Sequence, residues 1–161
     1  MRLVQKYRRN NKLLATIVNT FQMKNLHVFY ADDDPEDLHF LTTVAKSNGH
    51  SITIFNSGTE MLEKLKTLDE KPDLIFLDEF MPNKTGCEVM SEIKQHDTLR
   101  GIPAIMLSGS CAQHLVVAYI SSGANYVVEK PNSLEDYNEM FLKVSKMDLK
   151  NYTPIATDFI K

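Results

Sequence analysis

Residues 73–86 read Asp-Leu-Ile-Phe-Leu-Asp-Glu-Phe-Met-Pro-Asn-Lys-Thr-Gly. Leu74 to Leu77 are all apolar, which indicates a short strand that is buried on both faces. Two acidic residues, Asp78 and Glu79, follow this run at once. Strands buried on both faces are typical of parallel sheets covered by helices, and such sheets collect their ligands at the carboxyl ends of the strands. We therefore expect a functional site directly after Leu77.

The same alternation of a short apolar run and a longer amphipathic run recurs five times from Leu26 onward. This pattern predicts a parallel sheet flanked by helices. The fold class is therefore α/β, with a doubly wound five-stranded sheet. The expected strands are 26–31, 51–55, 74–77, 103–107 and 126–128, and the expected helices are 35–47, 58–68, 87–96, 112–122 and 133–146.

The composition is that of one globular domain. The chain has 161 residues, of which 43% are hydrophobic and 24% charged, so it can bury a core of ordinary size. Six basic residues and no acidic ones precede Asp32, so the remainder has a formal charge of −9 against −3 for the whole. An acidic body argues against a nucleic-acid partner. Two cysteines suit a reducing cytoplasm, and no apolar run is long enough for a membrane span.

The two ends differ from the rest of the chain. Residues 1–24 form a basic extension with apolar residues at helical spacing. It could be a docked amphipathic helix, a secretory leader around 13–18, or non-native residues ahead of a start at Met23. Residues 148–161 are expected to form a short tail, and we expect no DNA-binding or enzymatic output domain within the chain.

Acidic residues follow two of the expected strands. Asp32, Asp33 and Asp34 come after the first strand, and Asp78 and Glu79 come after the third. Carboxylates at short range repel one another unless a cation neutralises them, and hard oxygen ligands suit Mg²⁺. Asp34 precedes a proline and is expected to cap the following helix instead. Asp32 and Asp33 are thus the candidate metal ligands after the first strand.

Two further polar residues follow the remaining strands. Ser108 ends the fourth expected strand, and Lys130 comes just after the fifth. Alone, a loop serine is usually a turn former and a lysine usually a solvated surface charge. Together with the acids they place a hydroxyl, an ammonium and a metal around one carboxylate. This combination suits a phosphoryl group.

Residues 25–147 resemble a response-regulator receiver domain, most closely the single-domain type. The resemblance is carried by four motifs in the family's order and spacing: Tyr-Ala-Asp-Asp-Asp-Pro at 30–35, the 73–86 stretch, Met-Leu-Ser-Gly-Ser at 106–110, and Gly-Ala-Asn-Tyr-Val-Val-Glu-Lys-Pro at 123–131. It implies a flavodoxin-like (βα)5 fold with strand order 2-1-3-4-5. It also implies that the chain is a phosphoacceptor rather than an enzyme in its own right.

The resemblance assigns roles residue by residue. Asp78 is the implied phosphoacceptor, and Asp32 and Asp33 are the implied acid pair that holds Mg²⁺ together with Asp78. Ser108 is the implied hydroxyl switch, and Lys130 the implied ligand of the phosphoryl oxygens.

Three backbone features are also implied. The carbonyl of Phe80 is expected on the metal, and the bond between Lys130 and Pro131 is expected to be cis. Gly86 is expected where a positive φ or close packing excludes a side chain.

The sequence departs from the family pattern at three positions. Phe80 stands two residues after the phosphoacceptor, where a polar residue is frequent, and the acidic Glu79 follows Asp78 directly. Val127 replaces the aromatic usual three residues before the lysine. Tyr126 cannot substitute for it, because adjacent strand residues face opposite sides. We therefore expect phosphorylation chemistry with a muted switch through Ser108 and Val127.

The remaining residues suggest no other chemistry. We expect all five histidines to be structural or solvated, and Cys87 and Cys111 to be small buried hydrophobes. The implied partners are a histidine kinase or phosphotransfer protein and an unknown downstream protein, with the chain a monomer or weak dimer. Two alternatives are a receiver-like scaffold that binds proteins without phosphorylation and a metal-dependent phosphatase with an Asp nucleophile. Such phosphatases usually carry a second Asp where this chain has Phe80.

Overall fold

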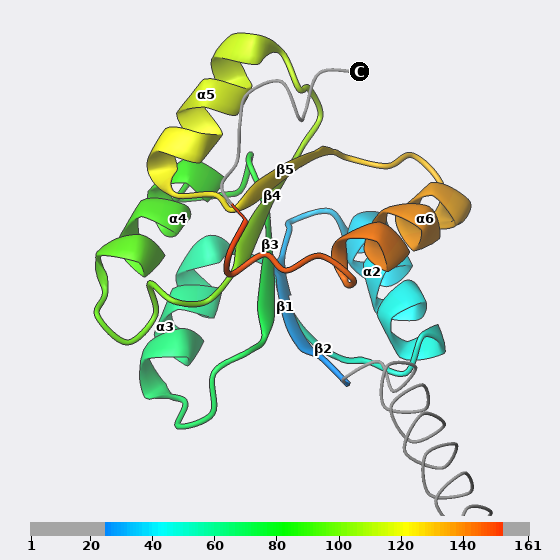
Figure 1. Cartoon of the computed structure of the whole chain (residues 1–161), viewed down its shortest axis with the longest axis horizontal. Helices are drawn as coiled ribbons and strands as arrows, with labels where there is room; N and C mark the ends of the chain where they lie inside the picture. The colour runs from blue at the N-terminus through cyan, green and yellow to red at the C-terminus, as the bar shows by residue number, and fades with distance from the viewer. Residues whose placement is uncertain (1–24, 153–161) are drawn as a thin grey trace, which may run out of the picture.

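The computed structural model describes residues 25–152 of the chain. Its centre is one sheet of five parallel strands in the order β2-β1-β3-β4-β5 (Figure 1). The strands are β1 His27–Ala31, β2 Ser51–Phe55, β3 Leu74–Asp78, β4 Ala104–Ser108 and β5 Tyr126–Glu129. This confirms the predicted fold class and strand order.

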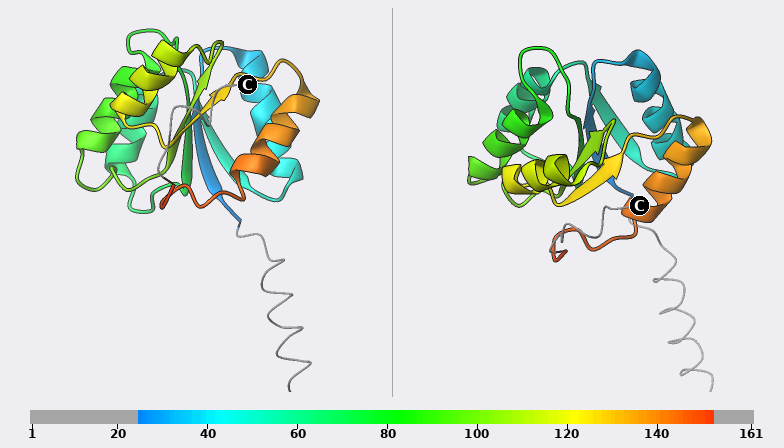
Figure 2. Two further views of the ribbon diagram at one scale, coloured as in Figure 1. Left: turned by 45° about the horizontal axis from the view of Figure 1, so that its top comes forward. Right: turned by 90° about the horizontal axis from the view of Figure 1, so that it is seen from above.

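Helices cover both faces of the sheet. They are α2 Pro35–Ser47, α3 Gly58–Thr67, α4 Gly86–Gln95, α5 Gln113–Ser122 and α6 Leu134–Val144. Helices α2 and α6 pack together on one face, and α3, α4 and α5 line the other, with the sheet between them (Figures 1 and 2). The sheet is therefore doubly wound, and its central strands are shielded from water on both sides.

The element boundaries agree with the sequence to within one or two residues. The informative difference lies at Asp78, which we expected to follow its strand, whereas Ser108 was expected at the end of the fourth strand. Asp78 instead pairs with Leu107 as the last residue of β3, and Ser108 pairs with Glu129 as the last residue of β4. The polar residues of the strand ends are thus held by the ladder itself, which fixes their backbone positions.

Local sequence sets where the helices begin. Asp34, Ser57, Thr85 and Ser133 each accept a backbone N–H with the side chain at the N-cap position. Such a cap typically contributes about 1 kcal/mol to helix stability. The expected cap at Asp34 is confirmed.

The chain stays in contact with the domain beyond α6. Leu149 is buried, and its carbonyl accepts a hydrogen bond from Asn125 Nδ2 at 3.2 Å. Tyr152 packs edge-on against Tyr126. The predictions for residues 1–24, and for the tail from residue 153 onward, lie outside the described residues. Between residues 25 and 152 no helix combines the length and apolar character needed to cross a membrane.

Gly86 begins α4 in a closely packed environment rather than at a positive φ. A methyl group there would collide with the backbone carbonyl oxygen of Asp78, and it would lie 2.8 Å from Met106 Sδ. The carbonyl belongs to the sheet and cannot move aside without shifting Asp78. Close approach of the α4 backbone to β3 therefore requires glycine at this position.

Replacing Gly86 by alanine should destabilise the fold by about 1–3 kcal/mol, because overpacking against backbone forces a shift of the main chain. Denaturant unfolding measures this loss. Gly101→Ala is the matched control, since a methyl there meets no atom within 4 Å. Equal stability of the two variants would contradict the packing argument.

His50 has a structural role in the described domain. The side chain is buried, and its Nδ1 accepts the backbone N–H of Leu26 at 3.0 Å. This assigns the ring proton to Nε2, which is buried and has no hydrogen-bond partner among the described residues. Burial lowers the pKa of His50 from its usual 6.5. The folded protein therefore holds this ring in the neutral form.

The depressed pKa gives the stability a defined pH dependence. As pH falls below about 6.5, the unfolded chain binds a proton at His50 that the folded chain does not, so the free energy of unfolding decreases until the folded-state pKa is passed. His50→Asn keeps an acceptor for Leu26 but cannot titrate. Urea unfolding from pH 7.5 to 5.0 should show a shallower loss for the variant, and equal slopes would contradict the assignment.

Candidate phosphoryl-acceptor site

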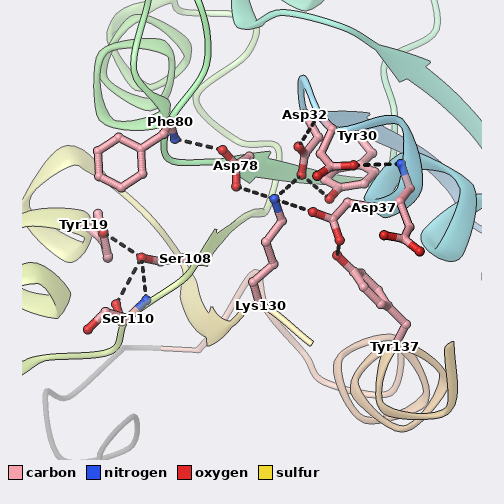
Figure 3. A network of polar contacts seen from close by, with 12 residues as sticks. Tyr30, Asp32, Asp37, Asp78, Phe80, Ser108, Ser110, Tyr119, Lys130 and Tyr137 are labelled. Carbon is pink, nitrogen blue, oxygen red and sulfur yellow. Dashed lines mark hydrogen bonds and ion pairs between the residues drawn. The ribbon is translucent and has the colours of Figure 1, made fainter. Parts of the chain in front are cut away.

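The strand order brings the predicted residues to one edge of the sheet. Asp32 follows β1, Asp78 ends β3, Ser108 ends β4, and Lys130 follows β5. These strands are neighbours in the order β1-β3-β4-β5 and run parallel, so their carboxyl ends meet (Figure 3). The backbone N–H of Lys130 also donates to the Ser108 carbonyl at 2.8 Å. The sheet thus positions all four residues together.

The ammonium of Lys130 is the centre of the site. Its Nζ lies 2.9 Å from Asp32 Oδ2, 2.8 Å from Asp78 Oδ1 and 2.7 Å from Asp37 Oδ2. Burial lowers the pKa of Lys130, but its bonds to the three carboxylates outweigh burial and hold the pKa above its ordinary value. The amine therefore remains charged and neutralises part of the acidic cluster.

Asp32 is fully buried, and its carboxylate accepts from the Lys130 ammonium and two further donors. The Tyr30 hydroxyl donates to Oδ2, and the backbone N–H of Asp34 donates to Oδ1 at 2.9 Å. Burial raises the pKa of Asp32, while the hydrogen bonds from Lys130 and Tyr30 oppose that rise. Burial, with help from the Asp32 carboxylate, also raises the pKa of the Tyr30 phenol, which keeps it a donor.

Asp78 projects from the wholly buried strand β3 and is 6% exposed. One carboxylate oxygen contacts Lys130, and the other accepts the backbone N–H of Phe80 at 2.8 Å. The Phe80 side chain is 73% exposed beside it. Asp78 is therefore held by two donors, the Lys130 ammonium and the Phe80 N–H.

The donor set fits a hard divalent cation. Asp32, Asp33 and Asp78 each offer a carboxylate oxygen, and these oxygens lie within 4.8 Å of one another. Asp33 is exposed, so a cation held there could keep part of its water shell, as Mg²⁺ does. One ammonium does not balance the carboxylates present. The site therefore has both the ligand chemistry and the excess negative charge that favour such an ion.

Two further acids near the strand ends, Asp34 and Glu79, make contacts outside the carboxylate cluster. Asp34 caps α2, and Glu79 is buried with its carboxyl group beside Cys87 at the start of α4. Burial raises the pKa of Glu79, and its hydrogen bonds with Cys87 lower it in part. Its Oε2 has no hydrogen-bond partner within residues 25–152. Among the described residues the acids that cluster as candidate ligands are Asp32, Asp33 and Asp78.

Ser108 is held away from the carboxylates by its own contacts. Its hydroxyl is 2.8 Å from the Tyr119 hydroxyl on α5 and 3.0 Å from the Ser110 carbonyl. Val127, in the next strand, is buried. The aromatic partner of Ser108 is therefore supplied by a helix, which the sequence pattern of β5 did not indicate.

The structure corrects two expectations. The Lys130–Pro131 bond is trans, as is every peptide bond of the described chain. An X-Pro bond favours trans by about 0.5–1 kcal/mol, and Lys130 reaches its carboxylates with the bond in that form. Cys87 and Cys111 are half-buried rather than buried, because they lie at the start of α4 and in the loop before α5, at the margin of the core.

Besides Tyr119, three residues of the network were missed by sequence reasoning: Asp37, Tyr30 and Tyr137. Asp37 lies in the first turn of α2, where an acidic residue is common for helix stability alone. Tyr137 lies on α6, and its hydroxyl donates a hydrogen bond of 2.8 Å to Asp37 Oδ1 (Figure 3). Tyr30 precedes Asp32 by two strand positions, and this spacing was the available signal that both face the same side.

Comparison with known proteins agrees with the fold and shows the family. Residues 28–141 match the family described as the response regulator receiver domain, and the chain belongs to this family. The chain is 28% identical over 133 residues to response regulator Rcp1 of Synechocystis sp., covering 78% of this chain and 90% of that protein. It is 26% identical over 118 residues to the two-component response regulator ORR11 of Oryza sativa subsp. indica, covering 73% and 80%.

A solved structure gives the same result. The Mn²⁺-bound form of response regulator Rcp1 superposes with a TM-score of 0.68 at 27% identity, covering 81% of this chain and 99% of that one. The fold of the phosphorylated cyanobacterial phytochrome response regulator RcpA is also similar, with a TM-score of 0.71 over 80% of this chain and 97% of that one.

Removing one acid from the cluster should stabilise the metal-free protein. Asp33 is exposed and adds negative charge beside Asp32 and Asp78, so Asp33→Asn should raise the melting temperature in chelator by about 1–3 °C. Asp34→Asn is the matched control, because it removes the same charge one residue away and keeps an equally good cap. Melting of Asp33→Asn clearly below wild type would mean that Asp33 is structural.

Proposed function

We propose that this chain is a single-domain response regulator that accepts a phosphoryl group on Asp78 from a histidine kinase or phosphotransfer protein. The observation that carries the proposal is the position of Lys130 Nζ, 2.8 Å from Asp78 and 2.9 Å from Asp32, beside a cluster that fits a divalent cation. Carboxylate, ammonium and cation together offer a nucleophile and positive charge for the equatorial oxygens of a phosphoryl group.

The transfer is an in-line displacement. An oxygen of Asp78 forms the new P–O bond while the P–N bond of the donor phosphohistidine breaks, and the departing imidazole nitrogen takes the electron pair of that bond. Asp32, Asp33, Asp78 and the backbone carbonyl of Phe80 would hold Mg²⁺, which supplies positive charge against the phosphoryl oxygens when bound. The Mn²⁺ named for the Rcp1 structure supports a divalent cation at this site.

The site's own residues would then respond to the acyl phosphate. Lys130 contacts a phosphoryl oxygen, and the Ser108 hydroxyl turns from Tyr119 and Ser110 toward another. Val127 is a buried aliphatic residue of β5 where the family usually has an aromatic one, so the change along β5 is muted. The output is a change in the protein surface that an unknown protein partner recognises. The receiver domain spans residues 25–147, and residues 148–161 form a short tail. The protein acts in the cytoplasm as a monomer or weak dimer and does not turn over a substrate.

Phosphorylation should occur on Asp78 alone. Incubation with acetyl phosphate and Mg²⁺ should raise the intact mass by one phosphoryl group, because the small donor bypasses the kinase. Asp78→Asn should show no increase, while Asp33→Asn should label slowly. Equal labelling of Asp78→Asn would overturn the assignment. No labelling of wild type would favour the unphosphorylated scaffold.

The phosphoryl group should be long-lived because of Phe80. Hydrolysis needs a water in line with the acyl phosphate, and the exposed Phe80 ring beside Asp78 offers that water no hydrogen bond. One positioned hydrogen bond contributes about 1–3 kcal/mol, or roughly 5- to 150-fold in rate. The Phe80→Asn variant should therefore lose its phosphoryl group at least about fivefold faster than wild type. The loss is measured from the intact mass at intervals after the phosphodonor is removed.

Phe80→Leu is the control for this prediction, since it removes the ring and supplies no hydrogen bond. Its rate should stay near that of wild type. A Phe80→Asn rate no faster than Phe80→Leu would remove the proposed role of the missing hydrogen bond.

A further inference from the structure

The contacts of Lys130 leave no proton free for a phosphoryl oxygen. An ammonium has three N–H donors, and Nζ contacts one oxygen each of Asp32, Asp37 and Asp78. The lysine head is largely enclosed, with the side chain 19% exposed. A phosphoryl oxygen that binds Nζ must therefore displace one of these carboxylates.

The three carboxylates differ in what else they contact. Asp32 and Asp78 belong to the cluster that fits a divalent cation, so a bound cation would neutralise both. Asp37 lies on α2 outside that cluster, and its other oxygen accepts the Tyr137 hydroxyl from α6. Asp37 is thus the competitor for Lys130 that the cation does not neutralise.

We propose that Asp37 is a positioning residue that holds Lys130 in the unphosphorylated protein and competes with the phosphoryl group for its ammonium. This inference rests on the proposed phosphorylation of Asp78. When a phosphoryl oxygen accepts a hydrogen bond from Nζ in place of Asp37, Asp37 loses its contact with Lys130 and keeps the hydrogen bond from the Tyr137 hydroxyl.

The competition also provides a second way for a change at the site to reach the surface of the protein. Tyr137 is fully buried in α6, and α6 packs along α2. The Lys130–Asp37–Tyr137 chain therefore joins the strand-end cluster to the α2–α6 face, whereas Ser108 faces α5 on the opposite side (Figure 3). Loss of the Lys130–Asp37 contact changes the environment of Tyr137 without any movement of Val127.

Beryllofluoride with Mg²⁺ is a probe of this competition, because it mimics a phosphoryl group on the acceptor carboxylate. Asp37→Asn replaces a charged acceptor of Lys130 by a neutral one, and hydrogen bonds to charged groups are about twice as strong as neutral ones. Beryllofluoride should therefore bind Asp37→Asn about fivefold or more tightly than wild type. Asp37→Glu, which keeps the charge, should stay within about twofold of wild type.

Glu36→Gln is the matched control for charge. Glu36 is the adjacent acid of the same helix turn, is exposed, and makes no ion pair with Lys130. Glu36→Gln should leave the affinity unchanged. An equal gain in Glu36→Gln and Asp37→Asn would show a general charge effect and overturn the proposal, as would no gain in Asp37→Asn.

Amide and ring spectra give a readout that a purely structural role would not move. In wild type, beryllofluoride should shift the signals of Asp37 and Tyr137, and in Asp37→Asn the Tyr137 shift on binding should shrink. An unchanged Tyr137 response in the variant would overturn the relay. Failure of wild type to bind beryllofluoride at all would overturn the proposed function itself, whereas binding by wild type without a gain in Asp37→Asn overturns this inference alone.

Discussion

The contact of one ammonium with three carboxylates is the constraint on which the site depends. Lys130 brings together β1, β3 and α2 through Asp32, Asp78 and Asp37. Two of these carboxylates are almost wholly buried, where an uncompensated charge is expensive. The fold tolerates them because the sheet delivers a lysine from the end of β5, two strands away from β3. The strand order is thus what allows the charge of the buried carboxylates to be offset.

The ammonium of Lys130 offsets only part of the negative charge of the three carboxylates. A single positive charge leaves the cluster acidic, which favours a bound cation. In the proposed function, that cation and Lys130 together would offset the negative oxygens of a phosphoryl group. Each polar residue is also secured by neighbours: Tyr30 on Asp32, the Phe80 N–H on Asp78, and Tyr119 on Ser108. Such preorganisation lets the residues act without a large rearrangement of the backbone.

The sequence was sufficient for those residues that the strands themselves position. Buried apolar runs identify β3 and β4, and parallel topology then brings Asp78, Ser108 and Lys130 to one edge. Asp37, Tyr119 and Tyr137 lie on helices, and their contacts depend on how α2, α5 and α6 pack on the sheet. Nothing in the local pattern separates Asp37 from an ordinary first-turn acid. The same limit applies to Glu79, whose burial beside Cys87 follows from the docking of α4.

The stability of a Lys130→Met variant tests the charge balance most directly. In chelator it should melt several degrees below wild type, because three carboxylates lose their shared cation, and Mg²⁺ should recover part of the loss by neutralising Asp32 and Asp78. Lys146→Met, which removes an exposed charge after α6, should melt near wild type under both conditions. A Lys130→Met variant as stable as wild type in chelator, or one that gains nothing from Mg²⁺, would contradict the account.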